Sequence, residues 1–301
     1  MLILFDDKNR VIGPAETTYP RWHEWKLSTL PKHKKATSVK IKNIYFALLG
    51  EEWSRPNCEQ GWDDRGTPPP PRGWGEVWKQ FHGLLGTPRD YKTRFKFLHR
   101  GLYTAHREAL IAAASNSQAS DRCELCQIHQ GTHTHLIECE HFDLLVEWLG
   151  QWATILEDNL TMNTADRIYG TYNGGEIMPP GLRFIYTILF KHYWMAYTSA
   201  HKENTTYSSI AVWKAIITRL KIVLHAFEIE TSKKIHQIET FFHQSNGHTA
   251  TKAEEMVEEE ITRRNDKLKP LGTLTYDEPT NTVELEKNFT WAEIQQIPED
   301  T

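Results

Sequence analysis

The chain has 301 residues, of which 39% are hydrophobic, 11% aromatic and 25% charged, a composition that excludes a largely disordered protein. No run of 18 apolar residues occurs, and the opening MLILFDDKNR is too short and too acidic for a secretory signal, so we expect an intracellular protein without a membrane span. Residues 1–107 hold 19 Lys and Arg against 11 Asp and Glu, whereas residues 108–301 hold 16 against 28. This imbalance fits either contact with a polyanion through one face or ordinary variation among solvated helices.

The segment 1–52 is expected to form a hairpin and a helix. LILFDDKNRVIG alternates apolar residues around a D-D-K-N turn, which predicts a β-hairpin. After a polar, basic stretch, Thr37 or Ser38 caps a helix that ends at Gly50. Residues 53–75 contain Pro56, the run Pro68–Pro71 and several glycines, and are therefore predicted to be a linker.

Residues 76–245 are predicted to form a helical domain with a zinc knuckle at 122–141. The helical period runs from Trp74 to Ser115 with a break at Gly86–Pro88, and it returns after the knuckle at 141–158, 181–202 and 207–243. An acidic extension, 246–301, follows, with a charged helix at 251–268, a hairpin at 273–285 and a short helix at 289–297. The fold class is thus mainly α: a multi-helix body with a small inserted zinc knuckle and short β-hairpins near both termini.

The knuckle prediction comes from three of the four cysteines. Cys123, Cys126, His135 and Cys139 give the spacing C-x2-C-x8-H-x3-C. Two thiolates two residues apart can hold one metal ion from a tight turn, and a His and a Cys at the start of a helix complete a tetrahedron. Such clustering is unlike a secreted disulfide framework and indicates a reducing compartment. We therefore predict one structural Zn²⁺, because four protein ligands leave no open coordination position.

The identity of the histidine ligand stays open at this point. His135 is favoured because H-L-I-E-C places it one turn before Cys139, and His133 is the second choice. His129 and His141 lie in or just beyond the same loop. The alternative is that these histidines are exposed loop residues and that the thiols are reduced and structural.

A basic segment with interleaved aromatic residues precedes the knuckle. Its aromatic residues are Tyr91, Phe95, Phe97 and Tyr103, and in a helix Phe95 and Leu98 would face the core. Cations neutralise phosphates and aromatic faces stack on unpaired bases, so the segment is a candidate nucleic-acid-binding surface, although a solvated helix face would look similar. The candidate residues are Arg89, Lys92, Arg94, Lys96, Arg100 and Arg107.

The order of these blocks resembles the zinc-binding C-terminal region of non-LTR retrotransposon reverse transcriptases. Besides C-x2-C and H-L-I-E-C, the resemblance covers T-S-V-K-I-K-N-I-Y-F-A-L-L at Thr37–Leu49 and W-K-Q-F-H-G-L-L-G-T-P-R-D-Y-K-T-R-F-K-F-L-H-R-G-L-Y-T at Trp78–Thr104. The helices Phe184–Tyr197 and Val212–Leu220 are similar to the tail of that region. In all it spans about residues 1–235.

The resemblance implies a region that follows a polymerase thumb and helps to hold template RNA or target DNA. The family commonly has four residues between the His and the last Cys, whereas three separate His135 from Cys139, and residues 251–301 have no counterpart. Asp6–Asp7 does not provide a polymerase site, because two-metal catalysis needs a further carboxylate and a complete palm. Cys58 has no orienting base, and no P-loop, G-x-S-x-G or H-E-x-x-H motif occurs.

These observations lead to two hypotheses, neither of them an enzyme. The first is a non-catalytic zinc-knuckle module that binds RNA or DNA, derived from or similar to the retroelement region and belonging to a ribonucleoprotein or the nucleus. The second is a structural subunit that docks on protein partners in a larger assembly, with zinc only stabilising the fold. The acidic rear half and the abundant tryptophans motivate the second hypothesis.

Overall fold

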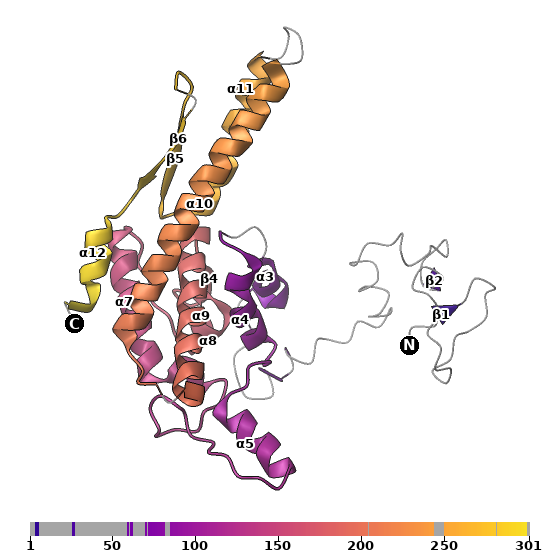
Figure 1. The fold of residues 1–301 in the computed structure, drawn as a ribbon, viewed down its shortest axis with the longest axis vertical. Helices are drawn as coiled ribbons and strands as arrows, with labels where there is room; N and C mark the ends of the chain where they lie inside the picture. Colours follow the sequence, from indigo (N-terminus) through magenta and orange to yellow (C-terminus); the bar gives the residue numbers. More distant parts are fainter. Residues whose placement is uncertain are drawn as a thin grey trace. The chain divides into compact units, whose positions relative to one another are not determined.

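The computed structural model of the chain describes residues 4–5, 26–27, 59, 61–62, 70, 72–81, 85–203, 205–243, 250–280 and 282–299. The chain divides into two compact units, Met1–Gln60 and Gly61–Thr301, and the boundary lies within the range predicted as a linker. Figure 1 shows the helices and strands of the second unit. This unit contains every helix and strand named below except the first two strands.

The described part of the first unit contains one antiparallel strand pair. β1 (Leu4–Phe5) pairs with β2 (Lys26–Leu27), so its partner comes from the stretch that the sequence indicated only as polar and basic. The turn and second arm of the expected N-terminal hairpin, the helix expected from Thr37 to Gly50, and Cys58 lie outside the described residues.

The second unit is mainly helical, as predicted. The helices after the knuckle begin and end within a few residues of their expected positions, since their long apolar stripes fix the period. Two short elements between them, α8 and the β3–β4 hairpin, were not predicted. The elements are α3 (Gly73–Lys79), α4 (Pro88–Leu98), α5 (Ala105–Ala114), α6 (His135–Glu138), α7 (Glu140–Ile155), α8 (Thr164–Tyr169), β3 (Thr171–Tyr172), β4 (Glu176–Ile177), α9 (Pro180–Glu203), α10 (Ser209–His243), α11 (Ala250–Leu268), β5 (Gly272–Asp277), β6 (Thr282–Lys287), α12 (Trp291–Gln296) and the 3₁₀ turn η3 (Ile297–Glu299).

Helix α9 is the central element of the core. It contacts α4, α7, α10 and α11, and in Figure 1 it runs beside α10 through the middle of the unit. Large aromatic side chains, among them Trp152, Phe184, Tyr193 and Trp213, are almost fully buried around it. None of the described helices has the length and apolar character that a bilayer span requires.

The described residues after 246 pack on the helices of the same unit. Helix α11 packs on α10, and the Arg264 guanidinium lies over the Phe227 ring at 5.0 Å. The Asn265 side chain pairs with both the N–H and the carbonyl of Leu274, which attaches β5 to α11. Trp213 donates its indole N–H to the Ile294 carbonyl at 3.0 Å, which fixes α12 against α10.

Helix α4 is positioned by its two ends and by one buried carboxylate. Pro88 occupies its first turn, where the missing N–H costs nothing, and the Thr87 N–H donates to Asp90 at 2.8 Å. At the other end Arg100 has a left-handed backbone (φ 51), and the Gly101 N–H donates to the Lys96 carbonyl at 2.7 Å, which forms a Schellman-type cap.

The Asp90 carboxylate joins three helices. Its side chain is fully buried and accepts hydrogen bonds from Lys191 of α9 at 2.9 Å and from Arg219 of α10 at 2.7 and 3.0 Å. Burial raises the pKa of Asp90, but the hydrogen bonds from Arg219, Lys191 and Thr87 outweigh it and hold that pKa well below its usual range. The carboxylate is therefore ionised, and it sets the spacing of α4, α9 and α10.

One prediction about α4 was wrong. Phe95 was expected to face the core but is 45% exposed, and it contacts Phe81 and His99 near the surface. The buried face instead carries Asp90, Arg94, Phe97 and Leu98, which are spaced as one helical stripe. The sequence suggested otherwise because a charged residue at the centre of a buried stripe is rare.

Candidate metal centre

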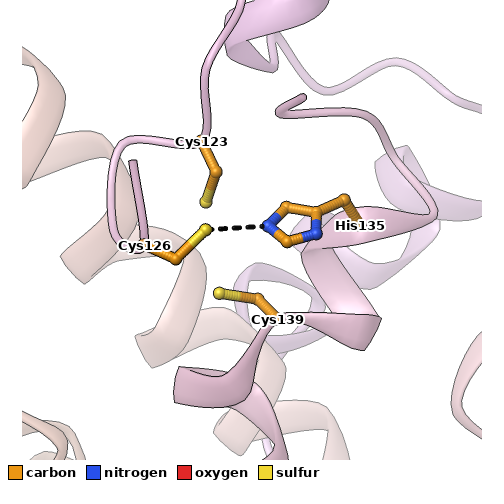
Figure 2. Close-up of side chains that lie close together, drawn as sticks. All are labelled: Cys123, Cys126, His135 and Cys139. Carbon is orange, nitrogen blue, oxygen red and sulfur yellow. Dashed lines mark hydrogen bonds between the residues drawn. The ribbon is translucent and has the colours of Figure 1, made fainter. Parts of the chain in front are cut away.

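A tight turn positions the first two cysteines of the knuckle. The Gln127 N–H donates to the Cys123 carbonyl at 3.0 Å, and the Cys123 N–H donates to the His129 carbonyl at 2.8 Å. Gln127 has a left-handed backbone (φ 57), which lets the chain reverse directly after Cys126. Both thiols consequently point to the same side of the turn (Figure 2).

The start of a helical segment positions the other two residues. The Thr132 hydroxyl accepts from the His135 N–H at 3.0 Å and so begins α6, and Cys139 is the N-cap of α7. His135 and Cys139 are four positions apart, which places them on the same side of the chain. Figure 2 shows their side chains directed at those of Cys123 and Cys126.

The four ligand atoms form a compact group. They all lie within 4.8 Å of one another, and the Cys126 Sγ and His135 Nε2 atoms are 3.3 Å apart. Around a tetrahedral zinc ion with Zn–S bonds of about 2.3 Å, neighbouring ligand atoms are about 3.5–3.8 Å apart. Cys123, Cys126 and Cys139 are not disulfide-bonded. The cluster could therefore hold one zinc ion with little rearrangement.

The surroundings of the sulfur atoms shift the pKa values of Cys123 and Cys139 in opposite directions. Backbone N–H groups of Leu125 and Cys126 donate to the Cys123 sulfur, and the His141 N–H donates to the Cys139 sulfur. The hydrogen bond from Cys123 to Cys139, and then burial, raise the pKa of Cys123 to about 12. The same hydrogen bond lowers the pKa of Cys139.

A buried hydroxyl group also faces the cluster. Tyr193 of α9 is fully buried, and its hydroxyl has no hydrogen-bond partner of ordinary geometry among the described residues. Burial and then the nearby sulfurs of Cys139 and Cys123 raise the pKa of Tyr193, so it keeps its proton. With zinc bound at the cluster, this protonated hydroxyl could donate a hydrogen bond to the Cys139 sulfur.

The knuckle is attached firmly to α5 and α9. The Gly131 carbonyl accepts from the His106 N–H at 3.2 Å, and a Cβ atom at Gly131 would lie only 2.9 Å from the Ala105 side chain. His201 contacts Glu124 through Nδ1 at 2.8 Å and Glu108 through Nε2 at 2.7 Å, which links the C-x2-C turn to both helices. The knuckle is thus part of a junction between helices.

The other histidines near the knuckle lie apart from the four ligand atoms. His133 is buried with its ring 6.3 Å from that of Phe97, and His141 packs on Tyr207 at 4.7 Å. His129 is exposed beside the His135 ring at 5.3 Å. Of the two histidines left open by the sequence, the structure places His135 in the cluster.

No family model, curated protein or solved structure matches this chain.

Three of the six predicted nucleic-acid-binding residues are held by the protein itself. Arg94 is 3% exposed, lies over the Tyr186 ring at 4.8 Å and donates to the Ile168 carbonyl. Arg100 donates to the Gly61 carbonyl at 2.7 Å, and Arg107 donates to the Arg100 carbonyl at 2.8 Å. The buried Arg94 cannot reach a phosphate, so its assignment was wrong, and Arg100 and Arg107 have structural roles.

The other three residues remain available on one exposed stripe of α4. Arg89, Lys92 and Lys96 follow helical spacing and are exposed, and none of them has a side-chain partner among the described residues. Tyr193 and His201 had no predicted role. Their signal was present, since Tyr193, Tyr197 and His201 are spaced four apart and so share the face of α9 that meets the knuckle.

Proposed function

We propose that this chain is a non-catalytic module that binds RNA or DNA and that one structural zinc ion stabilises its knuckle. The observation that carries the proposal is the α4 stripe of Arg89, Lys92 and Lys96, three exposed cations without a carboxylate partner among the described residues. Unpaired cations in a row repel one another, so a polyanion that spans them gains favourable interactions with all three.

The zinc ion has a structural role in this proposal. Three thiolates and one imidazole fill a tetrahedral coordination sphere, which leaves no position for a substrate or an activated water molecule. The ion would hold the C-x2-C turn against the start of α7, and through His201 it would also hold the turn against α5 and α9. The cationic helix α4 packs on the same helix α9.

The resemblance to the zinc-binding region of non-LTR retrotransposon reverse transcriptases also supports the proposal. That region follows a polymerase thumb and helps to hold template RNA or target DNA. On this basis the module belongs to an intracellular ribonucleoprotein, in the nucleus or another reducing compartment. The basic residues 1–107, with 19 Lys and Arg against 11 Asp and Glu, agree with such a partner.

A salt titration tests this function. Fluorescence anisotropy would measure binding of labelled RNA and DNA by the full chain between 50 and 200 mM salt. We expect affinity to fall with salt, and each lost phosphate contact should reduce the log–log slope by about 0.7–0.9. The triple substitution Arg89→Gln, Lys92→Gln and Lys96→Gln should therefore reduce the slope by about 2–3.

A matched variant controls for total charge. Lys233→Gln, Lys234→Gln and Lys252→Gln remove the same charge from exposed positions on α10 and α11. This control should bind like the wild type. If the chain binds neither RNA nor DNA, the proposed function is wrong. If the two triple variants weaken binding equally, the α4 stripe is not the surface that binds the nucleic acid.

One observation favours the alternative, a subunit that docks on other proteins. Helix α5 buries only Ala105, while Leu110 is 59% and Ile111 49% exposed. Neighbouring exposed apolar side chains are one feature of protein interfaces. A tagged pull-down after nuclease treatment separates the two functions: protein partners that survive nuclease and are lost in Leu110→Ser with Ile111→Ser would favour the scaffold.

A further inference from the structure

A cleft of about 340 Å³ lies between α4, the turn that leads into α5, and α9. Its volume falls at the lower end of the range for small-ligand sites, about 300–1,000 Å³. The side chains on which its chemistry depends are cationic or aromatic: Lys92, Lys96, Tyr103, Trp194, His201 and Lys202. None of them belongs to the metal cluster.

Two walls of the cleft are positively charged. Lys92 and Lys96 are exposed on α4 and Lys202 is exposed on α9, and none of the three has a side-chain partner among the described residues. Glu108 is the one carboxylate among the described residues that line the cleft, and it is already paired with His201 at 2.7 Å. The cleft therefore attracts an anion.

Two aromatic rings in the cleft are held in place. Tyr103 is 58% exposed, and the Arg107 guanidinium lies over its ring at 4.8 Å. Trp194 is half-buried and stacks on Tyr197 with ring centroids 5.2 Å apart and planes 13° from parallel. Rings fixed in this way lose little conformational freedom when another flat ring stacks on them.

The combination selects for one kind of ligand. Exposed rings next to unpaired lysines suit a group that carries both a flat aromatic system and a phosphate, which is the chemistry of a nucleotide. In a duplex the faces of the bases are covered by their neighbours, so only an unpaired base can stack on a protein ring.

We propose that this cleft binds an unpaired nucleotide of a single-stranded nucleic acid. The base stacks on Tyr103 and Trp194, and the flanking phosphates lie on Lys92, Lys96 and Lys202. The assignment rests on the proposed nucleic-acid-binding function and narrows it from nucleic acids in general to single strands. His201 joins the cleft wall to Glu124 in the C-x2-C turn, so a zinc ion bound to that turn would also help to keep the shape of the cleft.

Anisotropy with an unstructured RNA or DNA oligonucleotide, and with a duplex of the same sequence, tests the assignment on the full chain. We expect the wild type to prefer the single strand. Tyr103→Leu should weaken single-strand binding about five-fold or more and leave duplex binding and its salt slope unchanged, because stacking contributes that much per base. Phe241→Leu removes an exposed aromatic ring from α10 and is the matched control.

Each other outcome identifies which idea fails. Equal affinity for both forms with no effect of Tyr103→Leu overturns the single-strand assignment, while salt-dependent binding would still support the proposed function. Absence of any binding overturns both. A free nucleoside monophosphate added as competitor should displace the oligonucleotide only at far higher concentration; equal potency would show a mononucleotide site and overturn the assignment. Thermal melts of both variants check that the fold is intact.

Discussion

Each of the four knuckle residues offers one donor atom, so the loss of one residue would remove a quarter of the coordination sphere of a bound zinc ion. Elemental analysis of the purified protein should find about one zinc ion per chain, because the four residues together form one complete zinc site. We expect Cys139→Ser and His135→Ala to abolish most of the zinc content. Their thermal midpoints should also fall, because metal binding contributes to folding free energy.

Another histidine provides the control for the metal prediction. His129→Ala removes a ring that lies 5.3 Å from His135 but outside the group of ligand atoms, and it should keep its zinc. A wild type without zinc after metal-replete purification would refute the metal centre. Equal loss of zinc in His129→Ala would refute the choice of His135.

Gly170 is the residue at which backbone conformation and packing most restrict the side chain. Its backbone is left-handed (φ 69), and a Cβ atom there would lie 2.2 Å from Arg94 Nη2. We expect Gly170→Ala to lower the free energy of unfolding by more than the cost of a left-handed alanine, about 1–2 kcal/mol. The reason is that the buried Arg94 guanidinium, held by Ile168 and Tyr186, has no room to retreat.

Gly174 separates the two causes. Its backbone is similarly left-handed (φ 78), but a Cβ atom added there would have no atom within 4 Å outside its chain neighbours. Gly174→Ala should therefore show the backbone cost alone. If urea unfolding gives the same loss for both variants, the packing of Arg94 against Gly170 does not contribute.

At the scale of helices and strands, periodicity in the sequence predicted what is long and regular. The helices α7, α9, α10 and α11 and the β5–β6 hairpin lie where their apolar patterns placed them. The six-residue helix α8 is too short for a period to be visible, and only its capping pair, Asn163 and Asp166, marks it. The ligand spacing indicated His135 from local geometry, but a buried Arg94 depends on partners such as Tyr186 that no local pattern reveals.

The ion pairs of Asp90 with Lys191 and Arg219 should contribute strongly to the free energy of unfolding, because they join α4, α9 and α10. Asp90→Asn keeps the shape of the side chain but leaves Lys191 and Arg219 without their counter-charge. Loss of one partner from a buried ion pair costs about 3–5 kcal/mol. The control Asp266→Asn breaks a pair whose side chains are 68% and 63% exposed, and should cost less than about 1 kcal/mol. Similar midpoints in urea for both variants would contradict this role.

The same carboxylate should make stability depend on acid. Because the pKa of Asp90 is lower in the folded chain than in the unfolded chain, its contribution is complete above the unfolded value of about 4 and is lost as pH falls below it. Urea midpoints measured from pH 7 down to pH 3 should fall less steeply for Asp90→Asn than for the wild type. Parallel curves would show that other carboxylates control acid unfolding.

Over the whole molecule, the C-terminal residues complete the main core. Ile294 and Ile297 are almost fully buried, and the Phe289 ring lies 5.5 Å from that of Trp152 in α7. Ile294→Ala should therefore cost about 2–5 kcal/mol and lower the main unfolding transition. Ile229→Ala, at a position that is 40% exposed on α10, should cost much less. A separate early transition in Ile294→Ala, with the main one unchanged, would instead show that the C-terminal segment folds independently.

The position of α12 in the chain also has a consequence for the order of folding. All four knuckle ligands are close in sequence, so the loop that they close is short and carries a small entropic cost. The Trp213–Ile294 hydrogen bond, by contrast, joins residues 81 positions apart, so it forms only after α10, α11 and the β5–β6 hairpin have been synthesised. A nascent chain could thus bind zinc while Trp152 and Trp213 are still uncovered, and the core would close only once α12 has been synthesised.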